Sequence, residues 1–297
     1  MERIDLQGQP LDLDLTLTCG QAFRWRKNES GIWRGVVRDK LIELALNGNE
    51  LLWRTYPSND EALVKDYLRL SDDVNTIYAQ LSAVDPHLAE LIQEFHGIRL
   101  LRQDPSETLL SFVCSAANSI PRIMAAIEAL SQKFGELVCE VDGSCYYAFP
   151  RVEVIADADR IALEQTATLA FRGANLKTVA QQILDKGEGW LMSLREAPYI
   201  EARNELLSLK GIGTKIADCV CLFALDKDES VPVDTHVKQL AERLFLPQMK
   251  AKSITGGVYK LICEVFIQRY GKYAGWAQQF LYYEDLLRTR ALGRGIR

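Results

Sequence analysis

The 297-residue chain has no long hydrophobic run. Its densest apolar stretch, residues 216–225, is interrupted by Asp218, whereas a membrane-spanning helix needs roughly 18 apolar residues or more. Residues 1–15 have two acids among the first five and no apolar core, which is not the pattern of a secretory signal or transit peptide. We therefore expect a protein that neither spans a membrane nor is secreted.

Cysteine and histidine are sparse, with seven and three residues. An odd number of cysteines scattered over a long chain argues against a disulfide framework and fits a reducing cytosol or nucleus. No His/Cys spacing is typical of a zinc site. Only Cys263 follows Cys221, which excludes a four-cysteine iron–sulfur cluster near the C-terminus. The sequence predicts no metal and no cofactor.

Positive charge is not in excess either, since 40 acidic and 35 basic residues give a net charge of −5. The composition, 48% hydrophobic and 25% charged, excludes a disordered chain, a collagen or a coiled coil. The acidic balance argues at first against a nucleic-acid partner. However, nine bases and three acids lie from Leu246 onward, a local net of +6 that leaves −11 for the rest. A solvated basic tail is the alternative interpretation of that segment.

Short β-compatible runs fill residues 31–56, and Asn47-Gly48-Asn49 supplies a turn between two of them. This pattern predicts an antiparallel meander. A helix start follows, with Ser58 or Asn59 able to cap it.

Apolar residues with helical spacing then continue to the C-terminus. The expected helical segments are 61–81, 86–95, 107–134, 157–163, 175–185, 200–209, 215–225, 235–244, 253–270 and 273–288. The predicted fold class is α+β. A small N-terminal antiparallel β-sheet domain with flanking helices is expected over residues 1–97, followed by a helical region over residues 98–297, with the seam near Gly97.

Residues 206–217, LLSLKGIGTKIA, contain a glycine turn between two helices. Gly211 and Gly213 permit positive φ and a close backbone approach. The exposed N–H groups of the turn and of the next helix, up to Ile216, form an anion site. This is typical of a helix-hairpin-helix, which binds a DNA phosphate without reading the base sequence. An ordinary glycine-rich turn between helices is the alternative.

Two reactive side chains follow the turn. Lys215 opens the second helix, where the positive end of the helix dipole favours the neutral amine that a nucleophile requires. Asp234 stands in Val231-Pro232-Val233-Asp234-Thr235-His236, after an extended segment and at a helix start. An N-cap is the alternative role for this carboxylate.

The segment GIGTKIADCVCLFALDKDESVPVDTH resembles the 8-oxoguanine DNA glycosylase/AP lyases of the helix-hairpin-helix superfamily, of the eukaryotic type. LTCGQAFRW (17–25) is similar to the family's N-terminal signature, RLLRQDPSETLLSFVCSAANSIPRI (99–123) to its central helix pair, and YAGWAQQFLYYEDL (273–286) to its C-terminal pocket helix (273–288). The resemblance covers nearly the whole chain. It implies a two-lobed helical glycosylase body, with the hairpin at 206–217 and the V-P-V-D-T-H segment at 231–236.

The resemblance implies catalytic roles for Lys215 and Asp234. Lys215 would attack the deoxyribose C1′, release 8-oxoguanine and form a Schiff base that permits β-elimination on the 3′ side. Asp234 would stabilise positive charge developing on the sugar.

The resemblance also implies a base pocket made by Gly20, Cys219, Pro232, Gln278 and Tyr282. The Gly20 carbonyl would accept a hydrogen bond from N7–H of the lesion, because guanine N7 is an acceptor whereas oxidation at C8 makes it a donor. Gln278 would contact the Watson–Crick edge of the base. Tyr282 and Cys219 would cover its two faces, with core packing and a buried structural cysteine as the alternatives.

Residues that would contact DNA are implied in the same way. They are Ala117, Asn118, Arg122, Phe171, Arg172, Gly211, Gly213, Ile216, His236 and Asp285. Ala117 stands where the family has an asparagine that fills the hole left by the flipped base, and Phe171 stands where it often has a tyrosine wedge. Because alanine makes no side-chain hydrogen bond, we expect weaker discrimination for cytosine opposite the lesion.

The expected partner is double-stranded DNA containing 8-oxoguanine, bound by a monomer in the cytoplasm or nucleoid of a prokaryote or the nucleus of a eukaryote. Backbone amides and a few arginines would bind it, which predicts a modest salt dependence. Two other functions are alternatives to this one. A helix-hairpin-helix glycosylase for another lesion often lacks the lysine, and a non-catalytic DNA-binding module would need no Lys–Asp pair.

Overall fold

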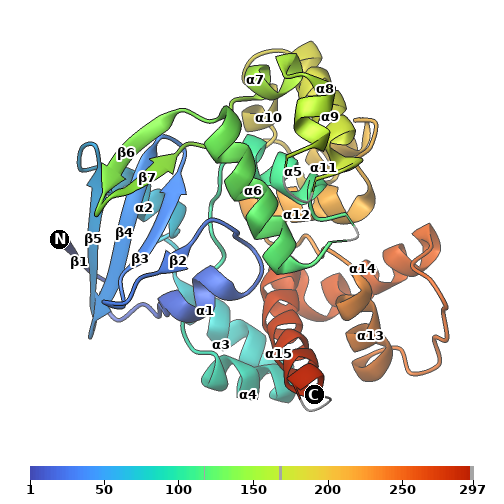
Figure 1. The fold of residues 1–297 in the computed structure, drawn as a ribbon. Coiled ribbons are helices and arrows are strands. Elements are labelled where there is room, and N and C mark those ends of the chain that lie inside the picture. Colours follow the sequence, from blue (N-terminus) through green and yellow to red (C-terminus); the bar gives the residue numbers. More distant parts are fainter. Residues whose placement is uncertain (117, 167–168, 295–297) are drawn as a thin grey trace.

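The computed structural model describes residues 1–116, 118–166 and 169–294, with side chains in the last helix described up to Thr289. Figure 1 shows a β-sheet at one side of the molecule and helices in the remainder. The predicted α+β class is therefore confirmed. No helix in the described part of the chain is long and apolar enough to cross a membrane.

Five antiparallel strands form the N-terminal sheet in the order β1-β5-β4-β3-β2. They are β1 (Glu2–Asp5), β2 (Arg26–Lys27), β3 (Trp33–Val37), β4 (Lys40–Asn47) and β5 (Glu50–Tyr56). Asn47 pairs with Glu50, so the expected turn is a two-residue hairpin, and Gly48 adopts the positive φ (60°) that such turns favour. Strands β1 and β2 lie outside the predicted meander of residues 31–56 and were not predicted from the sequence.

Helices α1 (Leu13–Thr18) and α2 (Glu61–Tyr67) pack their apolar faces on the sheet. Asp60, and not Ser58 or Asn59, caps α2 by accepting a hydrogen bond from the backbone N–H of Leu63 at 2.9 Å. The later helices are α3 (Val74–Val84), α4 (Pro86–Glu94), α5 (Pro105–Val113), α6 (Ile120–Phe134), α7 (Val152–Asp157), α8 (Arg160–Glu164), α9 (Arg172–Lys186), α10 (Trp190–Ser193), α11 (Tyr199–Leu207), α12 (Thr214–Ala224), α13 (Thr235–Leu244), α14 (Gly256–Tyr270) and α15 (Ala274–Arg294), with a 3₁₀ turn at Gly271–Tyr273.

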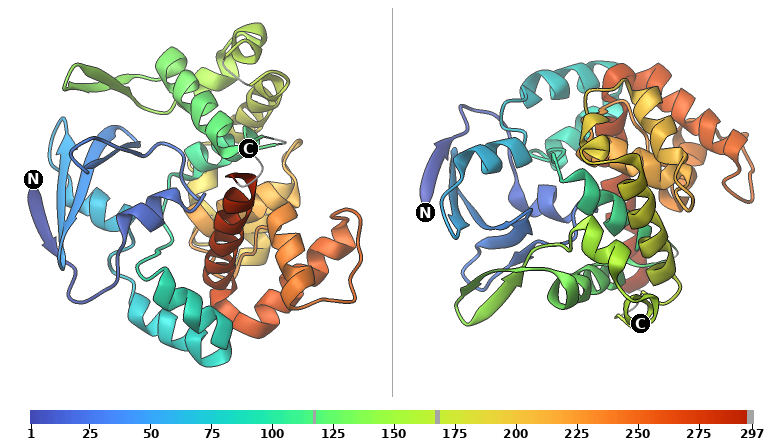
Figure 2. Two further views of the ribbon diagram at one scale, coloured as in Figure 1. Left: turned by 60° about the horizontal axis from the view of Figure 1, so that its bottom comes forward. Right: turned by 90° about the horizontal axis from the view of Figure 1, so that it is seen from above.

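The helices form two lobes with separate apolar cores. One core unites α3 and α4 with α13, α14 and α15, and the other unites α5 to α11. In the left view of Figure 2 the olive-green helices lie above and the orange and red helices below. Helices α5, α6 and α12 contribute to both cores; in α12, Cys219 belongs to the first and Cys221 to the second. The domain boundary near Gly97 stays a prediction.

Three segments expected as single helices are each divided into two. Segment 61–81 is interrupted at Arg69, which adopts a positive φ of 49°. Segment 107–134 is interrupted between the end of α5 and the start of α6. Pro121 lies in the first turn of α6, where a residue needs no backbone N–H to donate within the helix. Segment 157–163 is replaced by α7 and α8. The sequence also missed a hairpin of β6 (Leu137–Val141) and β7 (Ser144–Tyr147).

Candidate active site

A cleft of about 810 Å³ is lined by residues of both helical lobes and by the loop after α1. The residues predicted from the sequence that line it are Gly20, Asn118, Gly213, Lys215, Ile216, Asp234, His236 and Tyr282. A smaller recess of about 40 Å³ is lined by Gly20, Lys215, Cys219, Pro232, Asp234, Gln278 and Tyr282. All five predicted base-pocket residues therefore line the same recess as both predicted catalytic residues. The recess holds only a few water molecules, so a purine would enter only after its walls separate.

Lys215 is the second residue of α12 and is half-buried. Its Nζ lies 3.3 Å from the Ser115 Oγ and 4.7 Å from the centroid of the Phe112 ring. The Ser115 hydroxyl donates its hydrogen to the Phe112 carbonyl at 2.6 Å. Because a hydroxyl has a single hydrogen, Ser115 accepts from the lysine, which fixes the amine at the cleft wall. This role of Ser115 was not predicted from the sequence.

Asp234 is the N-cap of α13, and its Oδ1 accepts a hydrogen bond from the backbone N–H of Val237 at 2.9 Å. The capping role weighed from the sequence is therefore present. A cap of this kind uses one of the two carboxylate oxygens, and Asp234 also lines both the cleft and the recess.

The glycine turn joins α11 to α12. Gly211 adopts a φ of 96°, and Gly213 begins α12 without a side-chain cap. The side chain of Gln182 on α9 holds the turn, since its Oε1 accepts from Lys210 N at 2.7 Å and its Nε2 donates to Lys210 O at 3.1 Å. The N–H groups at the start of α12 are thus held in the arrangement that binds anions at helix N-termini.

The loop after α1 presents Gly20 to the recess. Gly20 has a φ of 92°, and a Cβ at this position would lie 3.1 Å from the Tyr282 ring. Gln279 on α15 anchors the loop by donating its Nε2 to the Cys19 carbonyl at 2.8 Å. Gln279 was not predicted from the sequence, because it lies 260 residues from its partner.

Gln278 is 4% exposed, and its Oε1 has no hydrogen-bond partner among the described residues. Such an unsatisfied buried amide is rare in folded proteins. Cys219, which lines the same recess, is 2% exposed, and burial raises the pKa of its thiol to about 12 although Lys215 opposes the shift. Cys219 is therefore a neutral thiol, and Gln278 supplies a free acceptor.

His236 at the cleft contacts Asp285 on α15, with 3.0 Å between Nδ1 and Oδ2. Asp285 is 1% exposed and is also paired with Arg243 and Arg288 at 3.3 and 2.8 Å. Burial acts to raise the pKa of this carboxyl, but the hydrogen bonds from His236 and Arg288 outweigh it and lower the pKa. The His236 ring meets Tyr282 edge-on, with centroids 5.9 Å apart.

Several residues predicted to contact DNA lie near the α5–α6 loop. Asn118 bonds back to the Cys114 carbonyl at 3.2 Å, and Ala117 lies outside the described residues. Arg172 is 7% exposed and donates its Nε to the Ala116 carbonyl at 2.7 Å. Phe171, beside it, is 59% exposed. Arg122 is exposed on α6. Contact with DNA stays a prediction for all of these residues.

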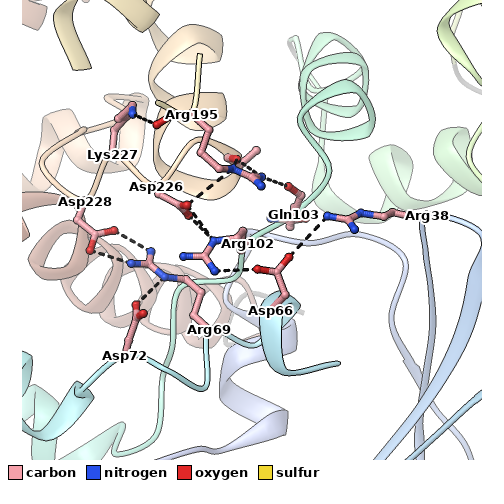
Figure 3. Close-up of polar contacts among 11 residues, drawn as sticks. Arg38, Asp66, Arg69, Asp72, Arg102, Gln103, Arg195, Asp226, Lys227 and Asp228 are labelled. Carbon is pink, nitrogen blue, oxygen red and sulfur yellow. Dashed lines mark hydrogen bonds and ion pairs between the residues drawn. The ribbon is translucent and has the colours of Figure 1, made fainter. Parts of the chain in front are cut away.

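Ion pairs anchor the loop that leads from α12 toward Asp234 (Figure 3). Arg69 makes two hydrogen bonds to Asp228, at 2.7 and 3.0 Å. Arg102 bridges Asp226 and Asp66, each at 2.8 Å. The N-terminal part of the chain therefore fixes one end of the loop that carries the predicted carboxylate.

No group of three or more His, Cys, Asp or Glu side chains within residues 1–116, 118–166 and 169–294 could hold a metal ion.

Known proteins are similar to this chain over most of its length. Residues 3–109 match the family described as 8-oxoguanine DNA glycosylase, N-terminal domain, and residues 110–256 match the HhH-GPD superfamily base excision DNA repair proteins. An N-glycosylase/DNA lyase of Arabidopsis thaliana is 32% identical over 95% of this chain and 79% of its own length. The N-glycosylase/DNA lyase of Saccharomyces cerevisiae is 33% identical over 96% of this chain and 86% of its own length.

The structure of a Clostridium acetobutylicum 8-oxoguanine glycosylase/lyase, in complex with dsDNA containing cytosine opposite 8-oxoG, is also similar. It has a TM-score of 0.84 and 33% identity, and covers 94% of this chain and 93% of its own. These matches confirm the resemblance inferred from the four sequence motifs. The chain belongs to the 8-oxoguanine DNA glycosylase family, within the HhH-GPD superfamily.

Proposed function

We propose that this protein is a bifunctional glycosylase/AP lyase that removes 8-oxoguanine from duplex DNA in base excision repair. The convergence of Lys215, Asp234 and Gln278 on one recess carries the proposal. A base inside a duplex cannot be reached, so the enzyme extrudes it from the stack. Lys215 then provides the nucleophile, and Gln278 provides a buried acceptor without a partner.

In the proposed reaction the Lys215 amine attacks C1′ and the C1′–N9 bond breaks, so the bonding pair leaves with the base, which takes up a proton. Asp234 stabilises the positive charge that develops on the sugar during this step. Loss of a proton from the amine and opening of the sugar ring give a Schiff base. The imine acidifies C2′–H, and β-elimination then expels the 3′ phosphate.

Recognition of the lesion follows from hydrogen-bond polarity. The Gly20 carbonyl accepts from N7–H of 8-oxoguanine and faces a lone pair in guanine. Tyr282 stacks on one face of the base, and Cys219 and Pro232 close the other side. A hydrogen bond made to one base and denied to the other is worth about 1–3 kcal/mol, so further selectivity comes from opening the recess.

We propose that the amides of the glycine turn and the side chain of His236 bind the DNA phosphates. The protein would act as a monomer, in the nucleoid of a prokaryote or the nucleus of a eukaryote. Few neutralised phosphates imply a small dependence of affinity on salt. Ala117 predicts weak preference for the base opposite the lesion. Excision rates with 8-oxoguanine opposite C, A, G and T test this, and a strong preference for C contradicts it.

Borohydride trapping on an 8-oxoguanine duplex tests the activity. The wild-type protein should form a covalent adduct and Lys215→Gln should not. A wild-type protein that yields no adduct, or a Lys215→Gln variant that yields one at full rate, refutes the mechanism. A glycosylase without a lysine nucleophile would excise a base without trapping.

A further inference from the structure

A fully buried carboxylate lies within α12, between the two predicted reactive segments. Asp218 is 0% exposed. Its Oδ1 accepts hydrogen bonds from Tyr199 at 2.7 Å and Arg203 at 2.8 Å. Its Oδ2 accepts from the Tyr259 hydroxyl at 2.6 Å. Burying a carboxylate is costly unless it is paired and hydrogen-bonded, and here both oxygens are satisfied, so the side chain has one defined position.

The Tyr259 hydroxyl bridges two parts of the chain. It donates to Asp218 and accepts from the backbone N–H of Val233 at 3.2 Å. A phenol has one hydrogen, which Asp218 takes, so the bond to Val233 uses an oxygen lone pair. Burial, followed by the charge of Asp218, raises the pKa of Tyr259 well above its usual value. The hydroxyl therefore keeps its hydrogen at neutral pH.

Val233 immediately precedes Asp234, and Pro232 before it has no N–H to donate. Within the described chain, α14 makes the hydrogen bonds to the backbone of 231–233: the Tyr259 hydroxyl accepts from Val233, and the Cys263 thiol donates to the Val231 carbonyl at 3.5 Å. The preceding residue, Ser230, donates its hydroxyl to the Asp218 carbonyl at 3.0 Å. The extended segment 231–233 is thus connected to α12 at two points. Ser230 bonds directly to Asp218, and Tyr259 joins Asp218 to Val233, the residue before Asp234.

The same helix carries the amine, since Lys215 lies three residues before Asp218, one turn along α12. Tyr259 also lines the main cleft. We infer that Tyr259 is a positioning residue of the proposed reaction, which fixes Asp234 relative to Lys215 by joining α12 to the segment 231–234. This inference rests on the proposed function and adds a residue that does not itself react.

The test is Tyr259→Phe, which removes the bridging oxygen and keeps the ring. Single-turnover excision of 8-oxoguanine should fall about ten- to hundredfold, because a misplacement of about 1 Å can cost a hundredfold in rate. Borohydride trapping on a duplex that already contains an abasic site should change less than about threefold. In that substrate the base has already gone, so its departure creates no positive charge on the sugar for Asp234 to stabilise. Loss of folded protein would lower both reactions equally and leave their ratio unchanged.

Tyr199→Phe is the matched control. It removes a 2.7 Å bond to the same carboxylate from α11 and leaves the bond between Tyr259 and Val233 in place. Its ratio of excision to trapping should match the wild type. The inference is overturned if Tyr259→Phe leaves that ratio unchanged, or if both variants lower it equally. A wild-type protein inactive in both assays would instead refute the proposed function itself.

Discussion

Gln278 provides a prediction in which stability and activity move in opposite directions. Its Oε1 is buried and has no partner among the described residues. Leaving a buried polar group unsatisfied costs about 1–3 kcal/mol. Methionine has a similar length and no amide, so Gln278→Met should raise the free energy of unfolding by about 1 kcal/mol.

The same change should slow excision. A hydrogen bond from the extruded base to Oε1 would be worth about 0.5–1.5 kcal/mol, and 1.4 kcal/mol corresponds to tenfold in rate. We therefore expect kcat/KM on an 8-oxoguanine duplex to fall about three- to tenfold. A polar group retained at a cost to the free protein is typical of functional sites.

The adjacent residue is the control. Gln279 is 2% exposed, but its Nε2 donates to the Cys19 carbonyl. Gln279→Met removes a satisfied buried bond, so the free energy of unfolding should fall by about 1–2 kcal/mol. Urea unfolding of the wild type and both variants, followed by tryptophan fluorescence, gives the comparison.

Two results would refute this reasoning. If Gln278→Met destabilises the protein as much as Gln279→Met, the amide oxygen is satisfied in the free protein. If Gln278→Met excises 8-oxoguanine at the wild-type rate, Gln278 does not recognise the base.

Three further predictions concern the loop after α1, the glycine turn and α5. Gly20→Ala should lower the free energy of unfolding by about 1–2 kcal/mol, because the φ of 92° disfavours a side chain. It should also slow excision, since the new Cβ meets the Tyr282 ring at 3.1 Å; wild-type values in both assays would contradict this. Gln182→Ala releases the Lys210 peptide and should weaken DNA binding about three- to tenfold, with single-turnover excision at saturating protein unchanged. A loss of rate at saturation would place Gln182 in the chemistry instead. Burial raises the pKa of Glu107 from 4.5 to about 7, so the folded protein holds this proton more tightly than the unfolded chain does. Stability should therefore fall as pH rises from about 4.5 to 7, and Glu107→Gln should remove that part of the decline in urea titrations; an unchanged slope would show that Glu107 ionises normally.

The glycine turn and the pocket helix could be predicted from the sequence because each is a local pattern. Gly211 and Gly213 mark the turn within a few residues, and Gln278, Tyr282 and Asp285 share a face through helical spacing. A local pattern also existed for the missed hairpin. Asp142-Gly143 lies between β-compatible residues, and both adopt the positive φ typical of such a turn.

The residues that support the site could not be found in this way. Tyr259 and Asp218 are 41 residues apart, and Gln279 and Cys19 are 260 apart. A tyrosine on α14 has the same helical spacing whether it packs in a core or bridges two segments. Only the folded chain shows that its hydroxyl lies between Asp218 and Val233.

The net charge of −5 also has a different meaning in the folded protein. Several arginines are used internally, since Arg69 pairs with Asp228 and Arg99, at 0% exposure, donates to the backbone carbonyls of Pro10 and Arg69. Arg172 is likewise buried against Ala116. The number of basic residues therefore overstates the cations available to a phosphate. We therefore propose that an acidic chain of this kind binds DNA through the oriented amides of its glycine turn, because a helix N-terminus attracts anions without a side-chain charge.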